Sequence, residues 1–196
     1  MNKSTINTEY TEYLKSPDLI WWKRLLDVQR PYRWNLRRLE LGFFLDIGCG
    51  VGRNLINLKG NGIGIDHNSA SIEIARKQGL NCFTSDDFNK SEFFIEKSFD
   101  SILLSHVAEH MTESEVVKLL KTYLPLLKSK GKVIIITPQE KGYKSDSTHN
   151  QFMNFETLQR ITEKLNLNYI KKYSFPFPRI IGRYFKYNEF VFIAEK

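Results

Sequence analysis

Short apolar runs alternate with segments of helical periodicity along most of the chain. Strands that are buried on both faces of a parallel sheet read as nearly continuous apolar runs. The alternation of such runs with helices is typical of a doubly wound α/β sheet. We therefore expect parallel strands at residues 43–47, 62–66, 81–85, 100–105 and 132–137.

Three segments between and after these runs have apolar residues at helical spacing. Residues 69–78 form the first, with Asn68 in position to cap it. Residues 113–128 form the second, and Pro125 is expected to kink its last turn. The third covers residues 155–165.

The end of the chain follows a different pattern. Residues 169–175 and 188–196 have strand composition, and no helical segment separates them. Two strands joined without a crossover helix are expected to pair antiparallel. The sequence therefore predicts a mostly parallel, doubly wound seven-stranded sheet with an antiparallel C-terminal hairpin at one edge.

Composition places this pattern in one domain. The chain has 196 residues, of which 41% are apolar and 13% aromatic, enough for one sizeable core. We expect a domain over 40–196 with an N-terminal extension over 1–39. The absence of a signal-like or membrane-spanning apolar stretch, together with only two cysteines, predicts a cytoplasmic protein without a membrane span.

The net charge of +7 is concentrated at the two ends of the chain. Residues 1–42 hold eight Lys/Arg and five Asp/Glu, and residues 165–196 hold six and two, whereas residues 43–164 hold fifteen of each sign. Basic ends that fold over a site would attract an anionic partner. The alternative is that these are ordinary solvated side chains.

Polar residues follow the predicted strands at their carboxyl ends, where open α/β sheets bind ligands. All four histidines of the chain come after such a strand end: His67, His106, His110 and His149. Because the ends of parallel strands meet at one edge, these side chains predict a functional edge.

A glycine-rich turn follows the first strand. Gly48, Gly50 and Gly52 give G-x-G-x-G, and Arg53 stands where a dinucleotide fingerprint needs its third glycine. Asp66, at the end of the second strand, is placed to accept hydrogen bonds from a ribose diol. The turn therefore favours a nucleoside ligand other than a dinucleotide.

Five segments in this order resemble class I S-adenosylmethionine-dependent methyltransferases of the small-molecule type. They are LDIGCGVG (45–52), GIGID (62–66), SDDF (85–88), FDSILLSHVAEHM (99–111) and KGKVIIITP (130–138). The resemblance covers about residues 40–170 and implies a Rossmann-like fold with S-adenosylmethionine as the cofactor.

The resemblance also implies a role for individual residues. The methionine portion of the cofactor would lie on Asp46 and on the backbone of Gly48, Cys49 and Gly50. The ribose hydroxyls would bind Asp66, and the adenine would lie between His67, the Asp86 carboxylate and the Asp87 amide. Ser105 and His106 would lie near the methyl group. Alternatively, Asp86 or Asp87 caps the next helix, and Asp46 ties the turn together.

Methylation of a hydroxyl also needs a base, for which His106 and His149 are the candidates. Glu109 and His110 are expected to have structural roles. The H-x-x-E-H pattern of residues 106–110 also matches a zinc protease motif. Because its first histidine directly follows a buried strand, and because the chain is short for that architecture, we expect neither proteolysis nor a metal site.

The acceptor is expected to be a small molecule, with a sugar or sugar-nucleotide hydroxyl favoured. Arg179 and Arg183 are suited to bind a phosphate or carboxylate, and residues 148–159 and 175–190 resemble methyltransferases found with bacterial surface-polysaccharide genes.

Trp21, Trp22 and Trp34 in residues 1–39 suggest a helical lid, or else a helix packed on the sheet. The alternatives are RNA or protein methylation, a binding-only module and a dehydrogenase; nucleic acid is disfavoured because no separate domain or NPPY-like motif is present.

Overall fold

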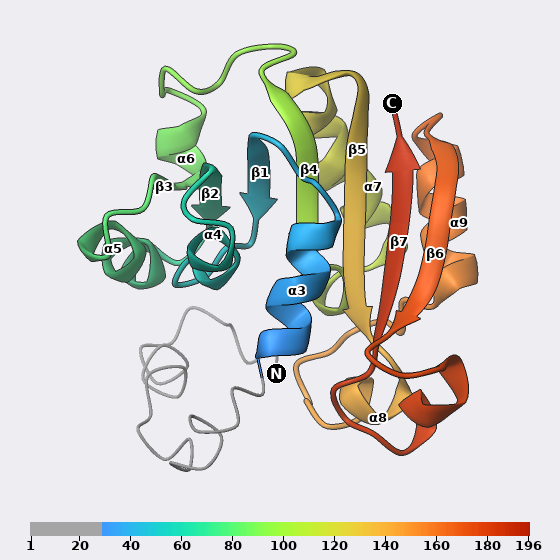
Figure 1. The fold of residues 1–196 in the computed structure, drawn as a ribbon. Coiled ribbons are helices and arrows are strands. Elements are labelled where there is room, and N and C mark those ends of the chain that lie inside the picture. The colour runs from blue at the N-terminus through green and yellow to red at the C-terminus, as the bar shows by residue number, and fades with distance from the viewer. Residues whose placement is uncertain (1–28) are drawn as a thin grey trace.

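The computed structural model describes residues 29–196, in which one seven-stranded sheet is flanked by helices. Its strand order is β3-β2-β1-β4-β5-β7-β6 (Figure 1). The strands are β1 (Phe44–Ile47), β2 (Gly62–Asp66), β3 (Cys82–Thr84), β4 (Phe99–Ser105), β5 (Leu127–Pro138), β6 (Asn168–Phe175) and β7 (Glu189–Glu195). The first five are parallel, and β7 pairs antiparallel with both β5 and β6. The predicted fold class is confirmed.

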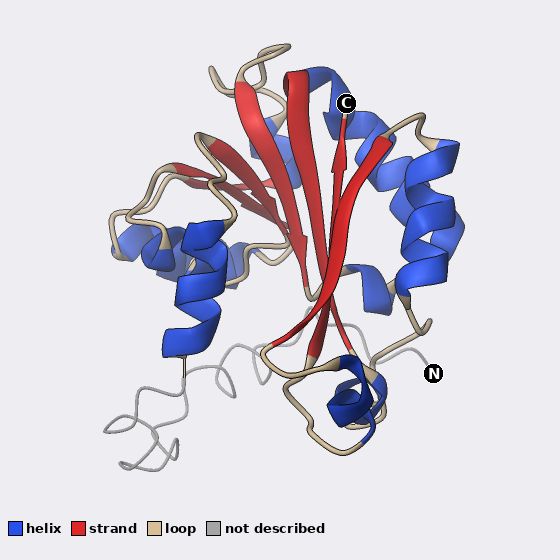
Figure 2. Cartoon of the chain, turned by 45° about the vertical axis from the view of Figure 1, so that its right-hand side comes forward, coloured by secondary structure: helices blue, strands red, loops and turns tan. Residues whose placement is uncertain are grey.

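Alternate residues of the strands enter two separate cores because successive side chains point to opposite faces. Leu45 and Ile47 belong to the core on one face, and Phe44 belongs to the core on the other. Both faces are covered by helices (Figure 2). This explains why the central strands read as continuous apolar runs rather than as an alternating pattern.

Helices line both faces of this sheet. They are α3 (Arg30–Arg38), α4 (Arg53–Asn57), α5 (Ser69–Lys77), α6 (Ser85–Phe88), α7 (Glu113–Tyr123), α8 (Glu140–Tyr143) and α9 (Phe155–Lys164), with short 3-10 helices η1 (Ala108–His110), η2 (Leu124–Leu126) and η3 (Arg179–Arg183). Buried side chains of α7 and α9 enter the core with Leu45, whereas those of α3, α4 and α5 enter the core with Phe44. The predicted cap of α5 is present, since Asn68 Oδ1 accepts from the amides of Ala70 and Ser71.

The second predicted helix ends earlier than expected. The α-helix stops at Tyr123, Pro125 lies in η2, and β5 already begins at Leu127. Proline lacks an amide hydrogen and its ring clashes with the preceding turn, so the helix ends at this point instead of bending. The expected helical segment 113–128 is therefore corrected at its end.

The N-terminal extension can be compared with its prediction only from residue 29 onward. Trp21 and Trp22 of the expected lid lie outside the described residues. Helix α3 packs on the sheet: Leu36 is buried in the core with Phe44, and the ring of Trp34 stacks on Phe175. Residues 30–38 thus form a helix packed on the sheet, as one of the two alternatives expected. The division between an N-terminal extension and a domain at residue 39 stays a prediction.

The strand ends that carry the predicted site meet at one edge, the lower edge in Figure 1. Ile47 at the end of β1 is level with Ile65 and Leu104, and Ser105 at the end of β4 is level with Ile136. Because β7 runs antiparallel to β5, it begins at this same edge, where Glu189 pairs with Pro138.

Candidate active site

The turn between β1 and α4 is held in a left-handed conformation by its glycines. Gly48, Gly50 and Gly52 have φ values of 75°, 53° and 82°, which side chains other than glycine rarely adopt. A Cβ at Gly48 would come 2.3 Å from Val107, whereas a Cβ at Gly50 would meet nothing within 4 Å. The turn is therefore packed at Gly48 and faces open space at Gly50.

Asp66 joins the end of β2 to this turn. Its carboxylate accepts hydrogen bonds from the amides of Gly50 at 2.9 Å and Asn68 at 2.8 Å. The His67 ring lies 3.4 Å from the same carboxylate, but most of the ring is exposed. The structure thus brings Asp66 and Gly50 together next to the open side of the turn. Their predicted contacts with a ribose and with a methionine portion stay predictions.

Asp46 is completely buried beneath the turn. Its Oδ1 accepts a hydrogen bond from the side-chain amide of Asn54 (Nδ2) at 3.2 Å, while Oδ2 has no hydrogen-bond partner among the described residues. Burial raises the pKa of Asp46 to about 7; the Asn54 bond lowers it, and the nearby Asp66 charge raises it further. An ammonium group such as that of a methionine moiety would neutralise the Asp46 carboxylate. The donor set fits S-adenosylmethionine.

Asp86 and Asp87 lie on α6 with both side chains exposed. Neither caps this helix, because the cap is Thr84, whose Oγ1 accepts from the Asp87 amide at 3.2 Å. The alternative in which one of the two aspartates is the cap is therefore corrected. The amide that the resemblance assigns to an adenine nitrogen is engaged in this capping bond, and the Asp87 carboxylate lies 3.7 Å from Arg76.

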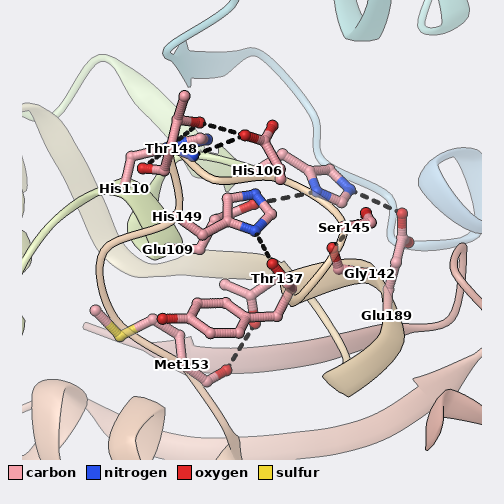
Figure 3. Close-up of polar contacts among 12 residues, drawn as sticks. His106, Glu109, His110, Thr137, Gly142, Ser145, Thr148, His149, Met153 and Glu189 are labelled. Atoms are coloured by element: carbon pink, nitrogen blue, oxygen red, sulfur yellow. Dashed lines mark hydrogen bonds and ion pairs between the residues drawn. The ribbon is translucent and has the colours of Figure 1, made fainter. Parts of the chain in front are cut away.

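His106 follows the half-buried Ser105 and lies between two carboxylates (Figure 3). Its Nε2 is 2.8 Å from Glu189 Oε1, and its Nδ1 is 3.2 Å from Glu109 Oε1. The side chain is 46% exposed. Desolvation lowers the pKa of the ring, but the adjacent carboxylates of Glu109 and Glu189 outweigh this effect and hold the pKa well above its usual range. With both ring nitrogens facing carboxylates, His106 has no free lone pair for a substrate proton. Its role as a base stays a prediction.

His149 has the lone pair that a base requires. The side chain lies in the loop after α8, where Nδ1 is 2.7 Å from the Tyr143 carbonyl oxygen and the ring stacks on that of Tyr143. A carbonyl only accepts, so Nδ1 carries the hydrogen and Nε2 presents its lone pair. The loop is fixed to η1 because the amides of Asn150 and Gln151 donate to the Glu109 carbonyl.

His110 and Glu109 contribute more to this edge than the sequence indicated. The rings of His110 and His149 are in edge contact, with centroids 4.9 Å apart. Glu109 is 1% exposed, and its carboxylate lies close to both rings. Sequence reasoning missed this grouping because it depends on how the loop after α8 folds back. The one available signal was that all these residues follow strand ends.

The two predicted anion-binding arginines are in different situations. Arg179 forms an ion pair with Glu140, in which Nη1 donates to Oε2 at 2.8 Å, and its guanidinium lies 4.7 Å from the centre of the Phe190 ring. Arg183 lines a surface hollow of about 430 Å³ together with Glu140, Lys141 and Lys144. Arg179 is therefore already paired, whereas Arg183 stands in a mainly basic hollow.

Comparison with known proteins identifies the family. The model of the methyltransferase domain matches residues 26–172. No protein of curated function matches the sequence. Among residues 29–196, no helix has the length and apolar character needed to cross a membrane.

Solved structures share the fold at low sequence identity. A methyltransferase from Archaeoglobus fulgidus that depends on S-adenosylmethionine has a TM-score of 0.69 at 21% identity, covering 92% of this chain and 100% of its own. The magnesium protoporphyrin IX methyltransferase of Synechocystis, solved with bound S-adenosylhomocysteine, has a TM-score of 0.67 at 13% identity, covering 100% and 97%. The predicted family is confirmed: the chain belongs to the methyltransferase-domain family and has the fold of class I S-adenosylmethionine-dependent methyltransferases.

Proposed function

We propose that the protein transfers a methyl group from S-adenosylmethionine to a hydroxyl of a small acceptor, a sugar or sugar nucleotide. The observation that carries the proposal is the buried Asp46 carboxylate, just before the glycine turn in the chain, whose Oδ2 lacks a partner among the described residues. A buried carboxylate without a partner is costly. The methionine ammonium group of the cofactor would remove that cost.

The bound cofactor supplies a methyl group on a positively charged sulfur. When the methyl group is transferred, the sulfur becomes the neutral thioether of S-adenosylhomocysteine, which is the leaving group. The protein must hold the acceptor oxygen in line with that methyl and exclude water. Asp66, fixed to the amide of Gly50, is placed at the end of β2 to orient the ribose. The ends of β4 and β5 then face the acceptor.

The acceptor hydroxyl has to lose a proton as its oxygen bonds to the methyl carbon. His149 is our candidate to take it, because the bond from Nδ1 to the Tyr143 carbonyl places the lone pair of the neutral ring on Nε2. His106 is assigned a different role: its ion pairs with Glu109 and Glu189 join the end of β4 to η1 and β7.

An anionic group on the acceptor would bind in the hollow beside α8. Three cationic side chains, Lys141, Lys144 and Arg183, line it with one acid, Glu140. A diphosphate of a sugar nucleotide is attracted by such a group of charges. This feature, together with the sequence resemblance to methyltransferases from polysaccharide gene clusters, favours a sugar nucleotide over a neutral acceptor.

The test is methyl transfer from labelled cofactor to a panel of nucleotide sugars, with S-adenosylhomocysteine and the methylated product both measured. We expect product with at least one panel member, and a fall in kcat of roughly 10²- to 10⁴-fold in His149→Ala with cofactor affinity retained. Methylation of RNA or protein, with none of the sugars, would overturn the acceptor assignment.

The cofactor assignment has its own pair of variants. Asp66→Ala should abolish binding of S-adenosylhomocysteine in calorimetry. Asp100→Ala is the matched control, because this aspartate binds the Phe43 amide and Lys128 near the start of β4, at the opposite edge of the sheet. Equal affinity in the two variants would disprove the role of Asp66.

A further inference from the structure

Three potential metal ligands meet beside His106. Glu109, His110 and His149 each offer one ligand atom, and these atoms all lie within 4.8 Å of one another. They come from η1 and from the loop after α8, two segments about forty residues apart in the chain. Figure 3 shows the three side chains gathered at the end of β4.

The carboxylate of this group is the least satisfied part of it. Glu109 is 1% exposed, and within residues 29–196 neither of its carboxylate oxygens has a hydrogen-bond partner. Oε1 has an ion-pair contact with His106 Nδ1 at 3.2 Å, which leaves Oε2 without any polar contact of this kind. The His106 ring is already the cationic partner of Oε1, so Oε2 is the buried oxygen that a further cation or hydrogen-bond donor would complete.

Both histidines are held in the tautomer that a metal ligand needs. His149 Nδ1 lies 2.7 Å from the Tyr143 carbonyl, and His110 Nδ1 lies 3.2 Å from the Thr148 carbonyl. The Thr148 hydroxyl, also 3.2 Å from His110 Nδ1, donates to Asp146 and so can accept here as well. In its neutral form each ring therefore donates through Nδ1 and has its lone pair on Nε2. Metal-binding histidines are typically oriented by such a bond to a carbonyl or carboxylate on their other nitrogen.

We propose that Glu109, His110 and His149 bind one divalent transition-metal ion. Two imidazoles and one carboxylate match the preferences of Zn²⁺, Fe²⁺, Co²⁺ and related ions, whereas Ca²⁺ and Mg²⁺ prefer sites made of oxygen ligands. Three protein ligands leave coordination positions open.

This ligand set differs from that of the zinc protease pattern in the sequence. In that motif both histidines of H-x-x-E-H bind the ion and the glutamate is the base. Here His106 Nε2 is bound to Glu189, and the second imidazole of the site comes from His149 instead. The geometry points to a metal site without the protease arrangement.

The ion would change the role of His149 in the proposed reaction. An oxygen bound to a divalent ion loses its proton at much lower pH than a free one. The ion, rather than an imidazole base, would then activate the acceptor hydroxyl. This last step rests on the proposed function; the metal site itself does not.

The test uses the full-length protein without an affinity tag, stripped with a chelator and titrated with Co²⁺ and Zn²⁺. We expect one equivalent to bind, with Co²⁺ giving visible absorption bands that Zn²⁺ removes. Glu109→Gln, His110→Gln and His149→Gln should each weaken binding by more than tenfold. His67→Gln is the matched control, because this exposed histidine lies outside the group, and it should bind as the unchanged protein does.

Two results would overturn the proposal: no binding by the unchanged protein, or equal binding by the three ligand variants. Circular dichroism checks the fold, and the two histidine variants keep the test valid if loss of the buried Glu109 carboxylate prevents folding. Calorimetry with S-adenosylhomocysteine on the same samples separates the two proposals. Cofactor binding without metal binding rejects the metal site alone, and metal binding without cofactor binding rejects the proposed function alone.

Discussion

At the scale of single residues, Asp46 shows most directly how the site is prepared for its ligand. The carboxylate is completely buried, with Asn54 as a partner for one oxygen only. Burial raises its pKa to about 7, so a large part of the population carries a proton near neutral pH. A cationic ligand group next to the carboxylate would favour the ionised form instead.

Asp46 is expected to make stability depend on pH. Its pKa is raised from the ordinary value of 3.8 to about 7 in the folded protein, so the folded state holds a proton that the unfolded state releases in this range. Its contribution is full below about pH 4 and is lost as pH rises through 7. Relative to the unchanged protein, Asp46→Asn should therefore gain up to about 4 kcal/mol between pH 4 and 8.

Urea denaturation of both proteins across this pH range measures that difference. Because both share every other titrating group, the comparison isolates Asp46. A difference in unfolding free energy that does not change with pH would contradict the raised pKa.

The same carboxylate predicts a proton release when the cofactor binds. Below pH 7 Asp46 is mainly protonated, and the methionine ammonium group should displace that proton. Calorimetry at pH 6 in buffers of different ionisation enthalpy should show release of up to one proton per S-adenosylhomocysteine. Asp46→Asn should show none from this site, and equal release by both proteins would place the ammonium group elsewhere.

At the scale of elements, the glycine turn combines packing with ligand access. The backbone at Gly48 and Gly50 is left-handed in both cases, but the space around the two residues differs. Gly48 has no room for a side chain because Val107 is next to it, whereas Gly50 faces open space. The same turn thus contains a tightly packed glycine at 48 and an open one at 50, where we propose that the cofactor binds.

Alanine substitutions should separate these two roles. Gly48→Ala places a Cβ 2.3 Å from Val107, so we expect left-handed strain plus overpacking, a loss of about 2–4 kcal/mol. Gly50→Ala should cost about 1–2 kcal/mol from strain alone, but reduce cofactor affinity by filling the open side. Denaturation and calorimetry measure the two effects, and equal stability losses would mean that the contact with Val107 relaxes freely.

The elements also show what the sequence could predict. The central strands were predictable because burial on both faces leaves continuous apolar runs, and α5 because Asn68 caps it. The start of β5 was missed because Lys128, Ser129 and Lys130 are polar residues between Leu127, which is buried, and Lys132, in a stretch where the pairing with β4 is irregular. Glu109 and His110 contact His149 only because the loop after α8 folds back. Glu189 lies next to His106 because of the register in which β7 pairs in the sheet. Local sequence reveals neither the loop conformation nor this register.

At the scale of the whole molecule, the charge pattern bears on the acceptor. The middle of the chain is balanced, and the excess of positive charge is at its ends. In the structure, Arg183 from the C-terminal part joins Lys141 and Lys144 at one hollow. Part of the chain's positive charge is thus gathered in one hollow beside α8.

Reversing that local charge should weaken acceptor binding. Lys141→Glu/Lys144→Glu is expected to raise KM for an anionic acceptor by tenfold or more, with cofactor affinity unchanged. Lys118→Glu/Lys121→Glu makes the same charge change at exposed positions on α7 and is the control. Steady-state kinetics at two salt concentrations measures both, and an equal rise of KM in the two variants would point to overall charge rather than to the hollow.

The position of β7 has a consequence for how the protein is made. Synthesis proceeds from the N-terminus, but β7 lies between β5 and β6 and carries Glu189, the partner of His106. Until Glu189–Glu195 has been synthesised, the edge of β5 stays unpaired and β6 has no neighbour. A nascent chain therefore exposes a strand edge that favours aggregation. The edge that carries His106 is complete only when β7 has been inserted.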